Sequence, residues 1–181
     1  MQTGIAEPTV VVRPAAPADA PAMAALHVRA WRAAYAGVMP DEFLAGLAIE
    51  EREAMWRRSL TTADRAPAER VILVAEHAGA VLGFTAAGHA RGDDELGLGE
   101  LYAINVDPPA WGGDAGGALL AAATAWLDAR FAASILWVVD GNARARRFYE
   151  SAGWAPDGAT RIDDYDGRRV ANLRYRRAAR A

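Results

Sequence analysis

GELYAINVDPPAWGGDAGGALLAAATAWLDARFAASILWVVD, residues 99–140, is the stretch that decides the fold. It opens with a segment, residues 99–107, that Pro108 ends. A glycine-rich turn follows and leads into apolar residues at helical spacing. The stretch closes with the almost wholly apolar segment 133–140. This order predicts a strand, a helix and a second strand. Two strands joined in this way lie parallel with a right-handed crossover. A strand as apolar as 133–140 is expected to be buried on both faces.

The flanking segments predict further strands, most of them antiparallel because short turns join them. These strands are 9–15, two within 70–90 joined at Ala78-Gly79, and two in the terminal hairpin around Asp166-Gly167. Together with 99–108 and 133–140 they predict a mixed, mostly antiparallel sheet of about six to seven strands. The predicted fold class is therefore α/β (α+β).

Helices are predicted on both faces of this sheet. They are 17–35 with Asp19 as a cap, one from Pro40-Asp41, one through 50–60, one after the glycine turn, and 142–153 closed by Gly153. Residues 61–69 are predicted as a loop. The chain is predicted to hold a single domain, residues 9–181, after a flexible tail of residues 1–8.

Composition narrows the function classes. The 181 residues are 52% apolar with a net charge of −3, which argues against a nucleic-acid partner. The chain has no cysteine, and its three histidines lack metal-ligand spacing, so no metal is expected. No apolar run approaches the about 20 residues of a membrane span, and no secretory signal is seen, so a cytoplasmic protein is expected. All 20 basic residues are arginine, which indicates the coding bias of a GC-rich genome.

The glycine turn at 111–117 precedes a helix, and a helix amino end offers unpaired N–H groups with about half a positive charge. This arrangement suits a phosphate. The turn matches neither G-x-x-x-x-G-K-[ST], since the chain has no lysine, nor G-x-G-x-x-G. Alternatively, the glycines permit only a tight turn and close packing of helix on sheet. From the turn alone both interpretations stay open.

Three stretches together resemble the GNAT superfamily, the acyl-CoA-dependent N-acyltransferases. LYAINVDPPAWGGDAGGALL (101–120) is similar to that family's strand, proline, cofactor loop and helix. LWVVDGNARARRFYESAGW (136–154) is similar to its late strand, asparagine and A-x-x-F-Y-x-x-x-G-[FW] helix, the most specific of the three. VRPAAPADAPAMAALHVRAWRAAYAGVMP (12–40) resembles the opening of many bacterial members. The resemblance covers residues 10–178.

The resemblance implies an N-acetyltransferase that moves an acetyl group from acetyl-CoA, a cosubstrate, to a primary amine of a small molecule or peptide. In such enzymes the two parallel strands splay apart, and the acceptor attacks the thioester directly. The pantetheine arm is then expected on the strand at Ile104, Asn105 and Val106. The diphosphate is expected on the loop made by Trp111, Gly112, Gly113, Asp114, Ala115, Gly116 and Gly117. A homodimer is left open.

Asp114 departs from the family's loop pattern, [QR]-x-x-G-x-[GA], in which it occupies the first glycine position and Trp111 the [QR] position. A carboxylate beside a diphosphate would repel it by about 1 kcal/mol or more if partly desolvated. Three arrangements are open. The side chain points to solvent, or it caps the helix and fills the anion site itself, or the pattern shifts by two residues to Gly116-Gly117-Ala118.

The resemblance also implies catalytic roles. Tyr149, on the helix after the second splayed strand, is the expected acid, with core packing beside Phe148 as the alternative. Glu100 is the expected base, with an ordinary exposed glutamate as the alternative. Asn142 is expected to contact the pantetheine arm or a buried water, or to cap the following helix.

Acceptor contacts are predicted from Trp31 and Tyr35, which are spaced to face one groove, and from Tyr102. Period-two alternation places Tyr102 on one strand face with Glu100 and Ile104. The arginines of the late helix either reach the 3′-phosphate of CoA or form a solvated face: Arg144, Arg146 and Arg147. A second function stays open, a degenerate member with weak or no acyl-CoA binding that serves as a sensing or interaction module.

Overall fold

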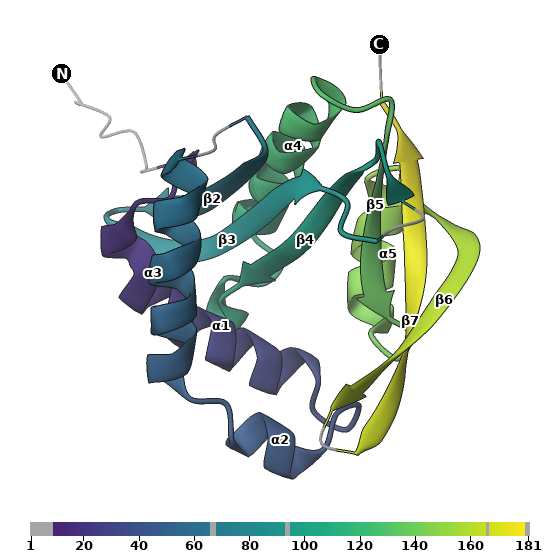
Figure 1. Cartoon of the computed structure of the whole chain (residues 1–181). Helices are drawn as coiled ribbons and strands as arrows, with labels where there is room; N and C mark the ends of the chain where they lie inside the picture. Colours follow the sequence, from purple (N-terminus) through teal and green to yellow (C-terminus); the bar gives the residue numbers. More distant parts are fainter. Residues whose placement is uncertain (1–8, 66–67, 93–94, 166, 180–181) are drawn as a thin grey trace, which may run out of the picture.

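The computed structural model describes residues 9–65, 68–92, 95–165 and 167–179 (Figure 1). The strands and helices follow the predicted order. They are β1 (Val11–Pro14), α1 (Ala20–Ala34), α2 (Asp41–Ala45), α3 (Ile49–Arg65), β2 (Arg70–His77), β3 (Ala80–His89), β4 (Gly99–Val106), α4 (Asp114–Asp128), β5 (Ala133–Val139), α5 (Ala143–Ser151), β6 (Ala155–Tyr165) and β7 (Arg168–Ala178).

The strands form one seven-stranded sheet in the order β1-β2-β3-β4-β5-β7-β6. The pair β4–β5 is parallel, and the other neighbouring pairs of this sheet are antiparallel. The strands β4 and β5 are parallel because α4 carries the chain back along the sheet between them, whereas a two-residue turn joins β2 to β3. The predicted mixed, mostly antiparallel sheet is confirmed.

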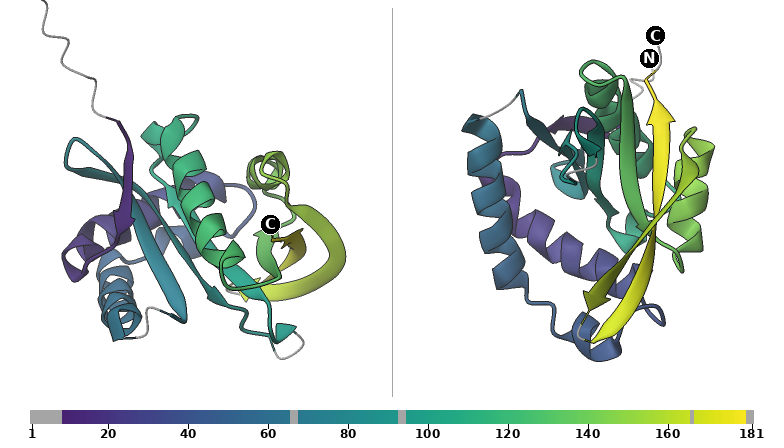
Figure 2. Two further views of the ribbon diagram at one scale, coloured as in Figure 1. Left: turned by 90° about the horizontal axis from the view of Figure 1, so that it is seen from above. Right: turned by 45° about the vertical axis from the view of Figure 1, so that its right-hand side comes forward.

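Helices cover both faces of the sheet, with α1 and α3 on one face and α4 and α5 on the other (Figure 2). Alternation along β2 explains this layering. Ile72 and Val74 belong to the apolar cluster of α1 and α3, whereas Leu73 and Ala75 belong to the cluster of α4. Apolar side chains on both faces of a strand demand a helix on each side.

Two local predictions are wrong. The helix α3 continues to Arg65, into the predicted loop 61–69. Within this extension the Thr61 hydroxyl donates to the Arg57 carbonyl 2.9 Å away, so its polar group is satisfied inside the helix. Asp19 stands at the start of α1 but makes no capping hydrogen bond to that helix. Its carboxylate instead accepts from the Ala16 N–H, which begins the short turn before α1, and from the Arg13 guanidinium, each at 2.8 Å. 

Turn chemistry, in contrast, is as predicted where the structure describes it. Ala78 and Gly79 both have positive φ, +50° and +82°, which suits the right-handed twist of a two-residue hairpin. Gly153 ends the helix region after α5 with φ +85°. The predicted tail, residues 1–8, and the turn residue Asp166 lie outside the described residues.

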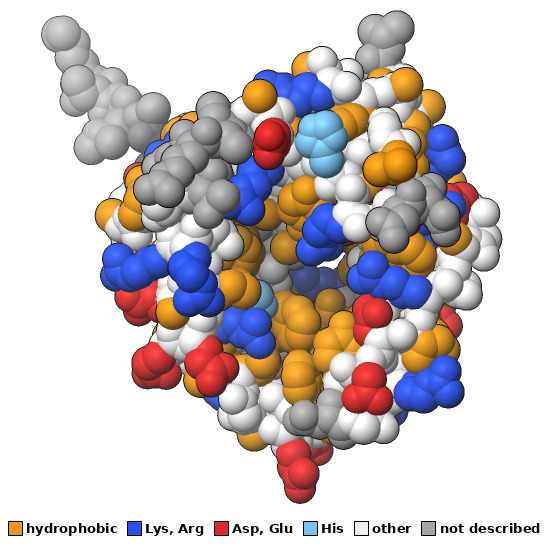
Figure 3. Space-filling model, in the orientation of Figure 1, with side chains coloured by type: hydrophobic (Ala, Val, Ile, Leu, Met, Phe, Trp, Pro, Cys, Tyr) orange, Lys and Arg blue, Asp and Glu red, His pale blue; other side chains and the backbone are white. Residues whose placement is uncertain are grey.

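The face covered by α1 and α3 is hollowed between α3 and the pair β6–β7 (Figure 3). Hydrophobic side chains lie in the floor of this hollow, and arginine side chains stand around its rim. The hollow lies over the region where β4 and β5 face each other (Figures 1 and 3).

Candidate active site

The parallel strands β4 and β5 pair over only a short length. Their register runs from Gly99 opposite Ser134 to Leu101 opposite Leu136. Beyond Leu101 the strands diverge, although each continues for several residues (Figure 1). The edge of β4 that β5 leaves therefore offers backbone groups for another partner.

A β-bulge lies where the strands part. Ala87 of β3 faces Leu101, but Ala86 faces Ala103, so Tyr102 is an extra residue in β4. A bulge bends a strand and increases its twist, which carries the rest of β4 away from β5.

This bulge corrects the prediction that Glu100, Tyr102 and Ile104 share one face. Tyr102 packs with the cluster of α1 and α3, but Ile104 packs with the clusters of α4. The extra residue shifts the period-two alternation by one position, so the side chains after it change faces.

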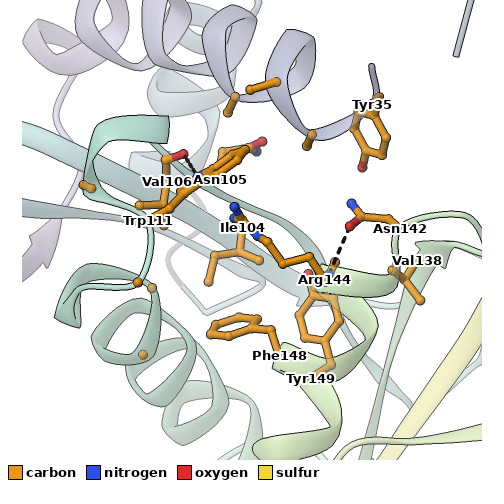
Figure 4. Close-up of a pocket in the computed structure, with 18 of the residues that line it drawn as sticks. Tyr35, Ile104, Asn105, Val106, Trp111, Val138, Asn142, Arg144, Phe148 and Tyr149 are labelled. Carbon is orange, nitrogen blue, oxygen red and sulfur yellow. Dashed lines mark hydrogen bonds between the residues drawn. The ribbon is translucent and has the colours of Figure 1, made fainter. Parts of the chain in front are cut away.

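A cavity of about 810 Å³ fills the opening between β4, β5, α1, α5 and the start of α4 (Figure 4). The predicted site residues that line it are Tyr35, Ile104, Asn105, Val106, Trp111, Gly112, Gly113, Gly116, Gly117, Asn142 and Tyr149. Those that do not line it are Trp31, Glu100, Tyr102, Asp114 and Ala115. Most of the predicted cofactor residues therefore line the cavity. Of the predicted acceptor residues, only Tyr35 does.

The glycine loop has a defined geometry. The Trp111 indole donates to the Val106 carbonyl at 2.7 Å, which ties the loop to the end of β4. Gly112 has φ +83°, a conformation that favours glycine. A Cβ at Gly117 would meet no protein atom within 4 Å. Close packing on the sheet therefore does not account for Gly117, and its missing side chain leaves room in the cavity.

The start of α4 supplies the backbone donors of this loop, since the first N–H groups of a helix lack intrahelical acceptors. Gly113 occupies the N-cap position and Asp114 is the first helical residue. The Asp114 side chain is exposed and lies outside the cavity lining. The structure thus has the first of the three arrangements, with the carboxylate toward solvent.

Arg144 adds a positive charge at this end of the cavity. Its guanidinium carbon lies 3.3 Å from the centre of the Trp111 ring, and partial burial lowers its pKa. Within the described part of the chain, no carboxylate forms an ion pair with it. Its neighbour Arg146 instead pairs with Asp140 at 2.8 Å, as expected of a solvated helix face. The two arginines therefore differ in environment.

Two phenols and an amide gather at the other end of the cavity (Figure 4). Tyr149 is 9% exposed, and burial, with a smaller contribution from Tyr35, raises its pKa. Burial and nearby Tyr165 raise the pKa of Tyr35 to about 12, against a hydrogen bond from Asn142. Both hydroxyls therefore keep their protons at neutral pH.

Asn142 connects α5 with α1. Its side-chain oxygen accepts from the Ala145 N–H at 3.0 Å, which confirms the predicted helix cap. Its side chain also points toward Tyr35, which follows the last residue of α1 (Figure 4). The cap of α5 thus lies beside a phenol from a distant part of the sequence.

The predicted residues outside the cavity have other partners. Glu100 is 2% exposed rather than an exposed strand residue, and Arg91 donates to it at 2.7 Å. The Arg91 guanidinium also lies 4.4 Å from the Tyr102 ring centre. Trp31 lies outside the cavity lining, with its ring 5.1 Å from that of Tyr35, centroid to centroid.

Sequence reasoning missed several lining residues. Trp137 is the half-buried residue of the otherwise buried β5, and an apolar strand gives no signal that one ring faces a cavity. The others are small or apolar residues that read as packing: Ala30, Ala33, Ala34, Ala110, Val138, Ala145 and Phe148. For Ala30, Ala33 and Ala34 the signal would be the alanine stripe along α1.

Two further findings concern the described residues alone. No helix among them is long and apolar enough to cross a membrane. No group of three or more histidine, cysteine, aspartate or glutamate side chains in the same ranges is placed to hold a metal ion.

Known proteins share this fold. Solved structures similar to the chain include PaiA N-acetyltransferase from Thermoplasma acidophilum in complex with coenzyme A, with a TM-score of 0.71 and 18% identity over 94% of this chain and 99% of that one. They also include YncA from Salmonella typhimurium with its cofactor acetyl-CoA, with a TM-score of 0.71 and 21% identity over 96% and 95%. At these identities the likeness shows the fold.

The sequence comparisons show the family. The profile of the Acetyltransferase (GNAT) family matches residues 26–154. The uncharacterized N-acetyltransferase YuaI of Bacillus subtilis (strain 168) is 33% identical over 135 residues, which cover 74% of this chain and 73% of that protein. Splayed strands, glycine loop and late helix thus occur in a chain that belongs to the GNAT family of N-acetyltransferases.

Proposed function

We propose that the protein transfers an acetyl group from acetyl-CoA to a primary amine by direct attack on the thioester. The observation that carries this proposal is the cavity between the splayed strands. It has anion-binding groups at one end and a buried phenol at the other. A ligand with a diphosphate and a reactive thioester separated by a long arm suits such a cavity.

The diphosphate end is supported by three features of the loop. The first-turn N–H groups of α4 are available to an anion. Gly117 leaves room for a ligand to approach the backbone. Arg144 supplies a guanidinium without a carboxylate partner among the described residues, held over the Trp111 ring. Asp114 does not oppose this charge at short range, because its side chain lies outside the lining.

The arm of the cofactor is expected along β4. One edge of β4 pairs with β3, where Gly83 faces Val106 and Thr85 faces Ile104. The other edge has no β5 partner beyond Leu101. Backbone amides on a free strand edge can pair with the amides of an extended ligand. The two solved relatives with coenzyme A or acetyl-CoA support a ligand of this class.

The acid is Tyr149. Acetyl-CoA supplies a thioester whose carbonyl carbon a neutral amine attacks, forming a C–N bond as the C–S bond breaks. The Tyr149 hydroxyl, kept protonated by its raised pKa, donates its proton to the departing sulfur. The attacking nitrogen loses one proton as the amide forms, and this proton returns to the tyrosinate through solvent, so that the products are the N-acetyl amide and the free thiol of CoA. Asn142 and Tyr35 line this end of the cavity. For Glu100 the base role stays a prediction, because that carboxylate lies outside the cavity and is paired with Arg91.

Calorimetric titration with acetyl-CoA, and release of free thiol with a panel of primary amines, test the proposal. Wild-type protein should bind acetyl-CoA and release thiol with at least one amine. Gly117→Glu should lose both, since it places a carboxylate in the loop. Ala121→Glu, which adds the same charge at an exposed position of α4 outside the cavity, should retain both. Neither binding nor thiol release by the wild type would favour a non-binding interaction module instead.

A further inference from the structure

The hollow beside the cavity contains a set of aromatic rings drawn from three separate elements. Trp31 of α1, Phe43 of α2 and Tyr165 of β6 are each half-buried. Their ring centroids lie 6.3 Å (Trp31–Phe43), 6.4 Å (Trp31–Tyr165) and 5.3 Å (Phe43–Tyr165) apart. We call these three residues the aromatic platform.

The aromatic platform is continuous with the cavity. Tyr35 lines the cavity, and its ring lies 5.1 Å from that of Trp31 in an edge-to-face contact. The platform is therefore one side chain away from the phenols at the thioester end. An acceptor whose amine lies beside Tyr35 would extend its remaining atoms toward these rings.

The platform suits an apolar group better than a cation. A cation bound by aromatic residues lies over ring faces that surround it. Here the three rings contact one another, edge to face or tilted, and leave no space between them. What they offer is a partly exposed apolar surface, which is stabilised when another apolar group covers it.

Three carboxylates near the hollow are already paired. Glu100 accepts from Arg91 at 2.7 Å, and Glu95 accepts from Arg174 at 3.1 Å. Asp163 accepts from Asn172 at 3.1 Å and from Arg161 at 3.2 Å. A second ammonium group could pair with one of these three only by displacing its guanidinium. Asp164 accepts from the Gly167 N–H at 2.8 Å, but it is exposed to water, where an ion pair contributes little.

Guanidinium groups also flank the cavity wall on this side. Trp137 lines the cavity, and Arg161 and Arg174 lie 4.5 Å and 5.8 Å from its ring centre. Both arginines are paired with carboxylates, so these side chains offer the second charge of a polycationic acceptor no free partner. Arginine side chains around the hollow in Figure 3 agree with this arrangement.

From this arrangement we infer that the acceptor is a primary amine with an apolar, preferably aromatic, group and no second positive charge. The inference rests on the proposed function and names the substrate class for the same site. The amine lies beside Tyr35, and the apolar group covers the aromatic platform. Polyamines and other polycations are poor acceptors.

Acetylation of phenethylamine, butylamine and putrescine tests the inference. The expected kcat/KM for phenethylamine exceeds that for putrescine by at least about tenfold, the scale on which apolar pockets separate ligands. Butylamine, which lacks both the ring and the second charge, should lie between them. Equal or faster acetylation of putrescine would overturn the inference.

Variants locate the effect on the platform. Phe43→Ala should bring kcat/KM for phenethylamine down to about that for butylamine, and Phe43→Leu should restore part of the difference. Ile162→Ala, at a side chain 54% exposed that alternates along β6 with Arg161 and Asp163, should leave the preference unchanged. Circular dichroism shows whether each variant is folded. An unchanged preference in folded Phe43→Ala and Phe43→Leu would also overturn the inference.

Direct binding separates this inference from the proposed function. Each amine is titrated by calorimetry into protein saturated with CoA, or into free protein if acetyl-CoA does not bind. Tighter binding of phenethylamine than of putrescine supports the inference even if no acetyl transfer is seen, which would contradict only the proposed function. Tighter binding of putrescine contradicts the inference whether or not transfer occurs.

Discussion

The two walls of the cavity are built differently. The cofactor wall, residues 104–117 with α5, offers backbone N–H groups, glycines and one guanidinium without a carboxylate partner in the described chain. The acceptor wall, made by α1, α2 and β6, offers aromatic rings, with Asp163 beside them paired with Arg161. Backbone donors recognise an anion whatever the surrounding side chains are, whereas rings recognise one ligand shape. Substitutions on the two walls should therefore have separable effects.

The largest expected effect comes from the group that both walls surround. Tyr149→Phe should lower kcat by about a hundredfold, because it removes only the hydroxyl that protonates the departing sulfur. The dissociation constant of acetyl-CoA should hardly change, since the ring remains. Stopped-flow thiol release and calorimetry measure the two quantities. A parallel loss of acetyl-CoA affinity would mean that Tyr149 belongs to the cofactor wall alone.

The pH profile adds a second check on Tyr149. Its raised pKa keeps the hydroxyl protonated through the range in which a free tyrosine would ionise, near its ordinary pKa of 10.0. The wild-type kcat should therefore not fall through loss of this proton below that pH. A loss of kcat below pH 10 that is absent from Tyr149→Phe would contradict the raised pKa of Tyr149, although it would leave Tyr149 as the acid.

A smaller effect is expected at the loop. Arg144→Gln should weaken acetyl-CoA binding by about tenfold, because a charge-assisted contact to a phosphate is lost. It should leave the preference among amines unchanged. Arg147→Gln removes the same charge from the same helix at an exposed position outside the cavity, and should have little effect. Equal losses of affinity in both variants would show that the total positive charge of α5 attracts acetyl-CoA, and that the position of Arg144 does not matter.

The stability of the protein is expected to fall in acid because of a buried histidine beside the acceptor wall. His27 is 7% exposed behind Trp31, and burial, with a contribution from Arg52, lowers its pKa from 6.5 to about 4. The unfolded chain therefore binds the proton more readily, and stability falls as pH drops below 6.5 toward the folded pKa. From about pH 7.5 to about pH 5.5 this should cost about 1 kcal/mol.

Urea unfolding at the two pH values measures this cost. The variant His27→Phe should lack the part of the pH-dependent stability loss that His27 causes, because the phenylalanine ring does not titrate. His89→Gln, at an exposed position, should retain it. The lowered pKa of His27 would be contradicted if the wild-type free energy of unfolding did not change between these two pH values. It would also be contradicted if His27→Phe showed the same change as the wild type.

The smallest effect is expected at Asp114. Asp114→Asn should change acetyl-CoA affinity by less than about threefold, since an exposed charge interacts weakly through water. Its position at the start of α4, outside the lining, is the reason. A clear gain in affinity, measured by calorimetry, would mean that the carboxylate turns toward the ligand.

The cofactor wall could largely be predicted from the sequence, because its residues are neighbours in the chain. The loop, the start of α4 and the cap at Asn142 follow from local glycine and helix-end chemistry. The face of Ile104 could not, since a single bulged residue leaves no mark in the pattern of apolar residues. Arg144 and Arg146 could not be told apart, because only the fold decides which of them faces Trp111.

The acceptor wall was mostly beyond the sequence. Trp31 and Tyr35 share a helix face, which spacing could predict, but Tyr165 joins them from the far end of the chain. Trp137 occupies a strand position that reads as core. Likewise, the charge of Glu100 gave no hint of its burial, which depends on Arg91 reaching it from the loop after β3. Contacts between distant segments are set by packing, for which single residues carry no local signal.

The extra residue in β4 has a consequence for how such a site could arise or vanish. Deleting Tyr102 would restore regular pleating, so that Leu101 would be followed directly by a residue on the correct alternate face. The two parallel strands would then have no reason to part, and their ladder could close over the space that the ligand needs. The space for the ligand in this chain thus depends on a single inserted residue whose own side chain lies outside the cavity.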